Sequence, residues 1–391
     1  MEQLCIIGAG PAGLMAGISA KSHHPELKVI ILEGNDKIGK KLQLTGGGRC
    51  NITANVDNEE IIKSVVKNGK FLYSGLSQLN SQTIQEFFKN EGCPLKIEDH
   101  NRVFPKSDKS EDIINVLKRK LDTLGIIVEL NRKVVDINLE KKLIICENRK
   151  MNYDYLIIAT GGNSYRDTGS DGSGYGLAQK FGHTITELFP AEVPLVSNDD
   201  FIREKILQGL SFADVELTIY QKGKAKERIT HDLIFTHFGI SGPVALRASF
   251  YVQRILKKEK VVNLTIDFLP KVSWNQLEEF LKDNSYENLS KEYNLPKRLL
   301  EFIRKNSKNK EEYLVYLKKF PMTTYETRGF NNAFVTNGGV NLKEVDPKTM
   351  CSKLIDNLSF GGEILDMNAY TGGYNITVAF VTGFVAGKYI K

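Results

Sequence analysis

Residues 4–13 read LCIIGAGPAG and lead into LMAGISA at 14–20. An apolar run that enters a glycine turn and continues as a helix is typical of a strand, turn and helix that bind a dinucleotide. In this pattern Gly8 permits the sharp turn, and Gly10 lets backbone amides approach a pyrophosphate. Gly13 lets the helix pack closely on the strand. The phosphates then lie at the helix N-terminus, where unpaired amides favour negative charge.

A second apolar strand follows at 27–32 and ends in Glu33. This acid lies about twenty residues past the last glycine, where the dinucleotide pattern places a carboxylate that accepts hydrogen bonds from ribose hydroxyls. A glycine triplet alone also occurs in ordinary tight turns. Here the strand, helix, second strand and terminal acid all occur in order, so the sequence predicts a dinucleotide site.

A second glycine-rich loop, TGGGRCN at 45–51, comes soon after Glu33 and follows Lys40 and Lys41. Three consecutive glycines expose backbone amides without side chains in the way, and such amides suit phosphate or flavin oxygens. A flexible surface loop is the alternative interpretation. The length and charge of this segment fit FAD, which spans from adenosine to isoalloxazine.

The chain has 391 residues, enough for two or three domains with a substantial core. Its formal net charge of +6 is a mild excess that allows anionic substrates. The excess is too small and dispersed to argue for nucleic acid by itself, and we expect no nucleic-acid partner.

Five cysteines are scattered without close pairing, which argues for reduced thiols in the cytoplasm and against a disulfide framework or a metal site. We expect no signal peptide, because the first strand begins almost at Met1. The most apolar segment, 378–390, is too short and too interrupted to span a membrane, so we expect a buried helix there.

Short β-branched runs at 126–130, 134–139 and 142–146 follow a helix that ends near Gly125. A helix and a small antiparallel meander are the usual crossover of glutathione-reductase-type (Rossmann-like) FAD domains, and this α/β class is the fold we expect. Val134 lies where such folds touch adenine, although a core valine is the simpler interpretation. The buried strand 155–159 ends in Thr160, Gly161 and Gly162 and returns the chain to the cofactor.

Composition changes near Pro190, and we expect four segments. Alternating strands and one helix at 243–256 predict an inserted β-rich domain. The Lys- and Glu-rich sequence that follows predicts a small helical subdomain. Its mixed charges indicate a face exposed to solvent. The expected bounds are 1–190 and 321–391 for the two parts of the FAD-binding domain, 191–270 for the β-rich insert and 271–320 for the helical subdomain.

The last helix is expected to open at Gly373, Tyr374 and Asn375, with Glu363 just upstream after a strand. Amides at its N-terminus would place positive charge beside the flavin pyrimidine ring. Glu363 is placed to accept hydrogen bonds from the ribityl chain. The alternative interpretation is that Gly372 and Gly373 simply cap a loop.

Seven motifs together resemble the BaiN-type family of bacterial flavoproteins, which are NAD(P)/FAD-dependent or aminoacetone-oxidase-like oxidoreductases. The motifs are TGGGRCNIT (45–53), ATGGNSY (159–165), GSDGSGYGLAQKFGH (169–183), FTHFGISGP (235–243), VTNGGV (335–340), SFGGEILD (359–366) and TGGYN (371–375). The resemblance covers nearly the whole chain and implies noncovalent FAD in a two-part domain. With the residues above, the expected cofactor-binding set is Gly8, Gly10, Pro11, Ala12, Gly13, Glu33, Lys41, Gly47, Gly48, Arg49, Cys50, Asn51, Val134, Thr160, Gly161, Gly162, Glu363, Gly373, Tyr374 and Asn375.

Catalytic side chains are harder to derive. His237 is a candidate proton donor or anion clamp, although a hydrogen-bonded turn residue explains it as well. Arg102 and Tyr374 are further candidates, and Tyr165, Arg166 and Arg247 are weaker ones.

The sequence therefore predicts an FAD-dependent oxidoreductase that moves hydride between flavin N5 and a small or medium organic molecule. Since a second nucleotide fingerprint is absent, NAD(P)H would bind only transiently. Two alternatives stay open. One is a flavin-dependent RNA-modifying enzyme, which should show a basic stripe with aromatic residues. The other is a flavin-binding protein without catalysis.

Overall fold

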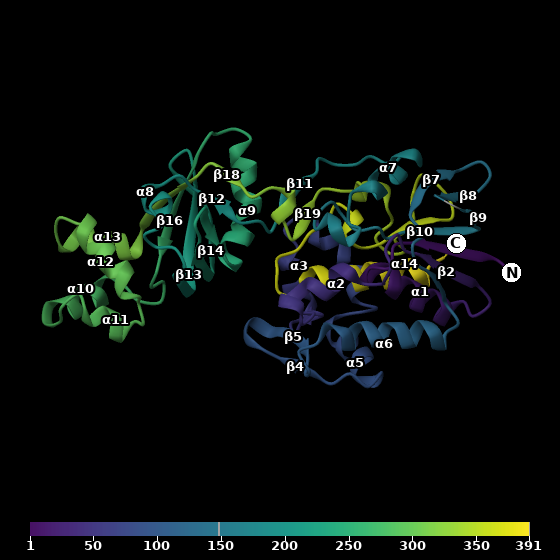
Figure 1. Cartoon of the computed structure of the whole chain (residues 1–391), viewed down its shortest axis with the longest axis horizontal. Coiled ribbons are helices and arrows are strands. Elements are labelled where there is room, and N and C mark those ends of the chain that lie inside the picture. The colour runs from purple at the N-terminus through teal and green to yellow at the C-terminus, as the bar shows by residue number, and fades with distance from the viewer. Residues whose placement is uncertain (148, 391) are drawn as a thin grey trace. The chain divides into compact units, whose positions relative to one another are not determined.

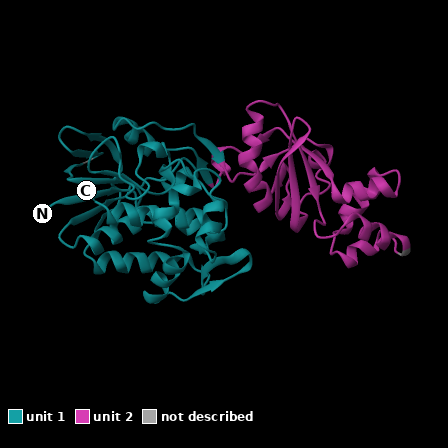
Figure 2. Cartoon of the chain, turned by 180° about the vertical axis from the view of Figure 1, so that it is seen from behind, with its two compact units in different colours: residues 1–190, 335–391 teal, residues 191–334 magenta. Residues whose placement is uncertain are grey.

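The computed structural model describes residues 1–147 and 149–390, which form two compact units. The first unit contains residues 1–190 and 335–391, and the second contains residues 191–334 (Figure 2).

The first unit is built on a parallel five-stranded sheet in the order β20-β10-β1-β2-β6. Its strands are β1 (Gln3–Ile7), β2 (Lys28–Leu32), β6 (Ile127–Glu129), β10 (Tyr155–Ile158) and β20 (Leu358–Phe360). Residues 126–130 were grouped with the runs that predict the antiparallel meander. In the structure they extend the parallel sheet instead, because β6 pairs with β2 from Ile30 to Leu32. Fully buried Leu4, Ile6 and Ile31 form the centre of the core.

Helices surround this sheet, and two small antiparallel sheets complete the unit. The helices are α1 (Pro11–His23), α2 (Lys40–Leu44), α3 (Asn58–Ser64), α4 (Tyr73–Leu76), α5 (Ser81–Asn90), α6 (Ser110–Thr123), α7 (Ser173–Lys180) and α14 (Tyr374–Lys388). One small sheet has the order β3-β5-β4, from β3 (Thr53–Ala54), β4 (Leu95–Ile97) and β5 (Arg102–Pro105). The other is the expected meander of β7 (Val134–Asn138), β8 (Leu143–Cys146) and β9 (Arg149–Asn152).

Helices α1 and α14 lie side by side because two glycines of α14 remove the side chains between them (Figure 1). A Cβ added at Gly383 would lie 2.1 Å from the carbonyl oxygen of Ala12, and one at Gly387 would lie 2.1 Å from that of Ala16. The apolar 378–390 segment thus forms part of a buried helix, as expected. None of the helices in the described ranges has the length and apolar character needed to cross a bilayer.

The second unit has a seven-stranded sheet in the order β17-β16-β13-β14-β15-β12-β18. Its strands are β12 (Leu195–Val196), β13 (Ser211–Gln221), β14 (Lys224–Phe235), β15 (Gly239–Ser241), β16 (Val262–Asp267), β17 (Phe320–Thr324) and β18 (Glu326–Thr327). Its helices are α8 (Asp200–Arg203), α9 (Pro243–Leu256), α10 (Trp274–Asp283), α11 (Asn288–Glu292), α12 (Lys297–Asn306) and α13 (Lys310–Lys318). The predicted helix at 243–256 corresponds to α9.

Two of the expected segment bounds differ from the structure. The chain does not return to the first domain at 321, because β17 pairs with β16 and β18 pairs with β12 inside the second unit. The first unit resumes at Val335. The helical segment also shares one apolar core with the sheet, since buried Leu277, Leu299 and Leu317 belong to the same cluster as the strand residues. The chain passes between the units at β11 (Phe189–Ala191) and β19 (Val335–Asn337), which pair as a two-stranded sheet.

Candidate flavin site

The turn between β1 and α1 uses its glycines in two different ways. Gly8 has φ +104°, and a Cβ on Gly13 would lie 1.9 Å from the carbonyl oxygen of Gly8, so both positions are closed to side chains by the protein itself. Around Gly10, no other atom of the described residues lies within 4 Å of an added Cβ. The fold therefore leaves open space at Gly10, beside the first turn of α1, whose amides lack helical partners. Pro11 and Ala12 form the start of this turn. Open space beside free amides fits a pyrophosphate.

Glu33 directly follows β2, and its side chain turns back toward this loop. Its Oε2 accepts a hydrogen bond from the backbone N–H of Ala9 at 2.8 Å. Its Oε1 accepts from the backbone N–H and the side-chain amide of Asn35 at 2.9 and 2.7 Å. These bonds fix a nearly buried carboxylate at the carboxyl edge of the sheet, which is where the sequence placed the ribose partner.

A polar network joins three distant parts of the chain. Lys41 Nζ donates to Glu363 Oε2 at 2.7 Å and to Ser164 Oγ at 2.9 Å. Glu363 Oε1 accepts from the backbone N–H of Thr336 at 2.8 Å and from Ser164 Oγ at 3.1 Å. Lys41 and Glu363 were both expected at the cofactor, and the structure brings them together. Ser164 and Thr336 were missed as site residues, although ATGGNSY and VTNGGV contain them.

The glycine loop at 45–48 adopts left-handed conformations that side chains disfavour. Gly46, Gly47 and Gly48 have φ of 59°, 69° and 86°. Added Cβ atoms on Gly47 and Gly48 would meet no other described atom within 4 Å, so this loop also presents open backbone. An exposed run of amides fits the oxygens of a phosphate or a flavin.

Arg49 and Cys50 follow the loop, and their contacts are internal. Arg49 Nη1 pairs with both Glu98 oxygens at 3.0 Å and with Asp108 at 3.3 Å, and its guanidinium lies 4.0 Å from the Phe104 ring centre. Two carboxylates therefore balance its charge. Cys50 is fully buried, and burial raises the pKa of its thiol to about 12. The thiol is therefore protonated at neutral pH.

The start of α14 is held close to β3. Gly373 has φ +96°, and an added Cβ would lie 2.5 Å from the carbonyl of Thr53 and 2.9 Å from Asn51 Oδ1. Asn51 Oδ1 also accepts from the backbone N–H of Val103 at 3.1 Å. Asn375 closes the preceding loop, because its side chain bonds the backbone N–H and carbonyl of Ala369 at 2.8 and 2.6 Å. Asn51 and Asn375 thus shape the helix start, whose first amides lack helical partners and point along the helix axis beyond its N-terminus.

Buried hydroxyls gather where strand β10 ends. Thr160 Oγ1, Ser170 Oγ and Tyr175 OH have no hydrogen-bond partner among the described residues. An added Cβ at Gly161 would lie 2.8 Å from Ser170 Oγ, and one at Gly162 would lie 2.6 Å from Thr336 Oγ1. Burial raises the pKa of Tyr175 well above its ordinary value, and the charges of Glu363 and Asp366 raise it further. Buried polar atoms without partners are rare in native proteins, so their presence fits a bound polar cofactor.

Val134 begins β7 and is buried. Its backbone pairs with Cys146 of β8. The neighbouring Lys133 pairs with Asp171 at 2.8 Å, which ties the meander to the loop before α7. Val134 therefore lies in the core of the meander, and its backbone contact with adenine stays a prediction.

The catalytic candidates do not gather within one unit. Arg102 forms an ion pair with the nearby Asp99 in the first unit. Tyr374 is buried at the first residue of α14 in the same unit. His237 is exposed in the second unit, where its ring lies 5.0 Å from that of Phe238 in an edge-to-face contact. Among the weaker candidates, Arg166 donates to Asn163 Oδ1 at 2.9 Å.

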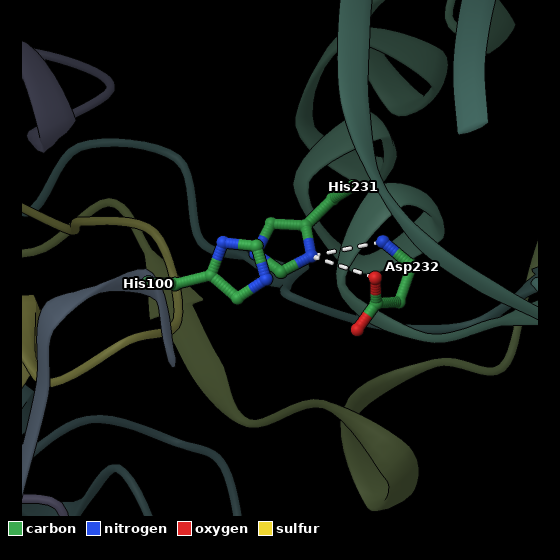
Figure 3. Close-up of side chains that lie close together, drawn as sticks. All are labelled: His100, His231 and Asp232. Atoms are coloured by element: carbon green, nitrogen blue, oxygen red, sulfur yellow. Dashed lines mark hydrogen bonds and ion pairs between the residues drawn. The ribbon is translucent and has the colours of Figure 1, made fainter. Parts of the chain in front are cut away.

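A second histidine of that unit is held by its own strand. His231 Nδ1 accepts the backbone N–H of Asp232 at 2.9 Å, as Figure 3 shows. The same Nδ1 lies 3.9 Å from Asp232 Oδ1, so both contacts hold the ring against its own strand. His100, the third labelled residue of Figure 3, belongs to the first unit.

Solved structures share this fold. The 3-ketosteroid-Δ4-(5α)-dehydrogenase of Rhodococcus jostii RHA1 has a TM-score of 0.54 at 13% identity and covers 99% of this chain and 96% of its own. A quinol-fumarate reductase has a TM-score of 0.54 at 17% identity, and the match covers 99% of this chain and 70% of the reductase chain. With the glycine turn and the open space beside it, this fold defines the class as a Rossmann-type nucleotide-binding α/β protein.

The family follows from the sequence as a whole. A model described as the HI0933-like protein Rossmann domain matches residues 2–389, so the chain belongs to the HI0933-like family. It is 31% identical to a 3-dehydro-bile acid delta(4,6)-reductase of Clostridium scindens, over 99% of this chain and 98% of that protein. It is also 29% identical to a ribosomal RNA dihydrouridine synthase of Haemophilus influenzae, over 99% and 98%. The expected family, fold class and FAD-dependent oxidoreductase activity are thereby confirmed.

Proposed function

We propose that this protein is a reductase that saturates a carbon–carbon double bond conjugated to a carbonyl group, with NAD(P)H as transient reductant. One observation carries the proposal. Two kinds of relatives match nearly the full chain, and their names describe the same bond change. A 3-dehydro delta(4,6) bile acid has double bonds conjugated to its ketone. Uridine has a ring double bond conjugated to a carbonyl, and dihydrouridine lacks it.

The reaction adds one hydride to the carbon far from the carbonyl and one proton to the carbon next to it. When bound, FAD supplies two-electron hydride chemistry at N5. The N-terminus of α14 would hold positive charge beside the flavin pyrimidine ring, and Lys41 with Glu363 would fix the ribityl region. Our candidates for the proton partner are Tyr374, Arg102 and His237, of which Tyr374 opens α14.

The substrate class has two candidates. The first is a free organic molecule of small or medium size, which the bile-acid relative supports. The second is a uridine within RNA, which the dihydrouridine synthases of Haemophilus influenzae and, at 27% identity, Escherichia coli support. Five free thiols, four of them buried, support the reducing cytoplasm as the compartment.

An anaerobic two-step titration tests the proposal. NADH or NADPH should bleach the flavin absorbance of the purified protein, and a 3-oxo-delta-4 steroid or a uridine-containing RNA should restore it. The corresponding saturated ketone and a dihydrouridine-containing RNA serve as matched controls and should restore nothing. If neither the steroid nor the uridine-containing RNA restores the absorbance of the reduced flavin, the proposal is wrong.

A further inference from the structure

The strand register of the second unit brings three separate segments to one end of its sheet. β13 ends at Gln221, whose backbone pairs with Lys224 across the turn into β14. β16 runs antiparallel to β13, with Leu264 opposite Ile219, so the residues just before Val262 lie at this same end. β17 runs antiparallel to β16, with Thr324 opposite Val262, so Tyr325 lies there too.

Lysines dominate these segments. Six exposed lysines lie there, and we call this set with Tyr325 the basic end: Lys222, Lys224, Lys226, Lys257, Lys258 and Lys260. Within the described chain, Lys222, Lys224, Lys226, Lys258 and Lys260 have no carboxylate at ion-pair distance. The acids at this end are the half-buried Glu227 and Glu259 and the exposed Glu326. The surface therefore carries net positive charge.

Apolar side chains accompany the charge. The side chain of Tyr325 is 37% exposed and that of Val261 is 43% exposed. An exposed aromatic ring near exposed lysines is the combination that binds single-stranded nucleic acid, because the lysines contact phosphates and a base stacks on the ring.

We propose that the basic end of the second unit is a docking surface for RNA. The proposal rests on the second substrate candidate above, a uridine within RNA. It departs from our expectation of a protein without a nucleic-acid partner, which was argued from the small and dispersed net charge of the whole chain. The basic end is a local excess of lysine, from segments that are 31 residues or more apart in sequence and that only the sheet brings together.

The test measures equilibrium binding of a fluorescein-labelled single-stranded RNA of about 20 nucleotides, longer than the usual footprint of one binding domain. The variants are the triple K222Q/K224Q/K226Q and, as a control of equal charge change, K291Q/K305Q/K308Q on the exposed surface of the helical segment. We expect the first triple to weaken binding at least about tenfold and to reduce the slope of log K against log salt by about 2. The control should stay within about twofold of the unmodified protein.

A second variant tests the aromatic contact. Tyr325→Ala should weaken RNA binding about tenfold without changing the salt slope, and Tyr325→Phe should restore it, because stacking needs the ring and not the charge.

Three results would overturn the proposal: no RNA binding by the unmodified protein, equal losses in both lysine triples, or stronger binding to phosphatidylserine vesicles than to RNA. Binding is measured without reductant, so its outcome is separate from that of the reductase test. RNA binding without restored flavin absorbance would refute only the proposed reaction. Restored absorbance with a free steroid and no RNA binding would refute only the docking surface.

Discussion

At the scale of single residues, Gly10 and Gly13 show that neighbouring glycines can have different roles, one in binding a ligand and the other in packing. The protein itself fills the space at Gly13, whereas the space at Gly10 is open. The sequence pattern assigned Gly10 to the pyrophosphate and Gly13 to the packing of helix on strand. The open space at one position and the filled space at the other agree with that assignment.

Replacing Gly10 by valine should therefore give a folded but colourless protein. The added Cβ meets no described atom within 4 Å apart from the adjacent residues, yet the branched side chain enters the space left for the pyrophosphate. Far-ultraviolet circular dichroism and the flavin absorbance of the purified variant measure the two effects. Gly13→Val is the contrast, because it should lose the fold as well. A yellow, fully loaded Gly10→Val protein would show that the cofactor lies elsewhere.

Cys50 should make the protein less stable in alkali. Its pKa is raised by burial to about 12 in the folded state, while an unfolded cysteine titrates near 8.5. The folded state then holds a proton that the unfolded state releases, so stability is intact below about pH 8.5 and falls as the pH rises toward 12. Between these two pH values, this one thiol lowers the free energy of unfolding by at most about 1.4 kcal/mol for each pH unit.

Urea unfolding at about pH 8 and about pH 10.5 measures this loss. Cys50→Ala should lessen the pH dependence and keep flavin binding. Cys5, which burial affects in the same way, should still contribute its own share. An unchanged pH dependence in the variant would mean that Cys50 titrates normally.

At the scale of elements, the contact between α1 and α14 couples the two ends of the sequence. α1 begins at the glycine turn, and α14 begins at the proposed flavin pyrimidine site, so a shift of one helix moves both ends of the cofactor site. The contact depends on backbone-to-backbone approach at Gly383 and Gly387.

Gly387→Ala should destabilise the protein by about 1–3 kcal/mol, because the new methyl would lie 2.1 Å from the Ala16 carbonyl oxygen and force the helices apart. Gly176→Ala in α7 is the matched control, since its added Cβ meets no described atom within 4 Å. There the same change should be neutral or stabilise by up to about 1 kcal/mol. Denaturant midpoints compare the two variants, and equal midpoints would argue against close packing of α1 on α14.

At the scale of the whole molecule, the expected cofactor residues all belong to the first unit, although the chain leaves that unit for residues 191–334. The chain leaves and re-enters through β11 and β19, which pair with each other. Their pairing keeps the two points of passage adjacent.

Replacing residues 191–334 by a short glycine-containing turn should therefore leave a soluble first unit that still binds FAD. The first unit has its own apolar core, and β11 and β19 are near enough for a tight connection. Flavin absorbance and a thermal melt of the shortened chain measure the result, with the full chain as reference. A folded but colourless product would mean that the second unit supplies part of the FAD site.

The sequence by itself determined the strand, glycine turn and helix at 4–20, the helix at 243–256, the family and the use of FAD, because these signals are local in the chain. It did not determine that Lys41 meets Glu363, which lies 322 residues away. Nor did it determine that residues 320–327 complete the second sheet, or that lysines of separate turns share one end of it. These features depend on strand order and register, and the free energy that selects them comes from burial across the whole unit and not from any one segment.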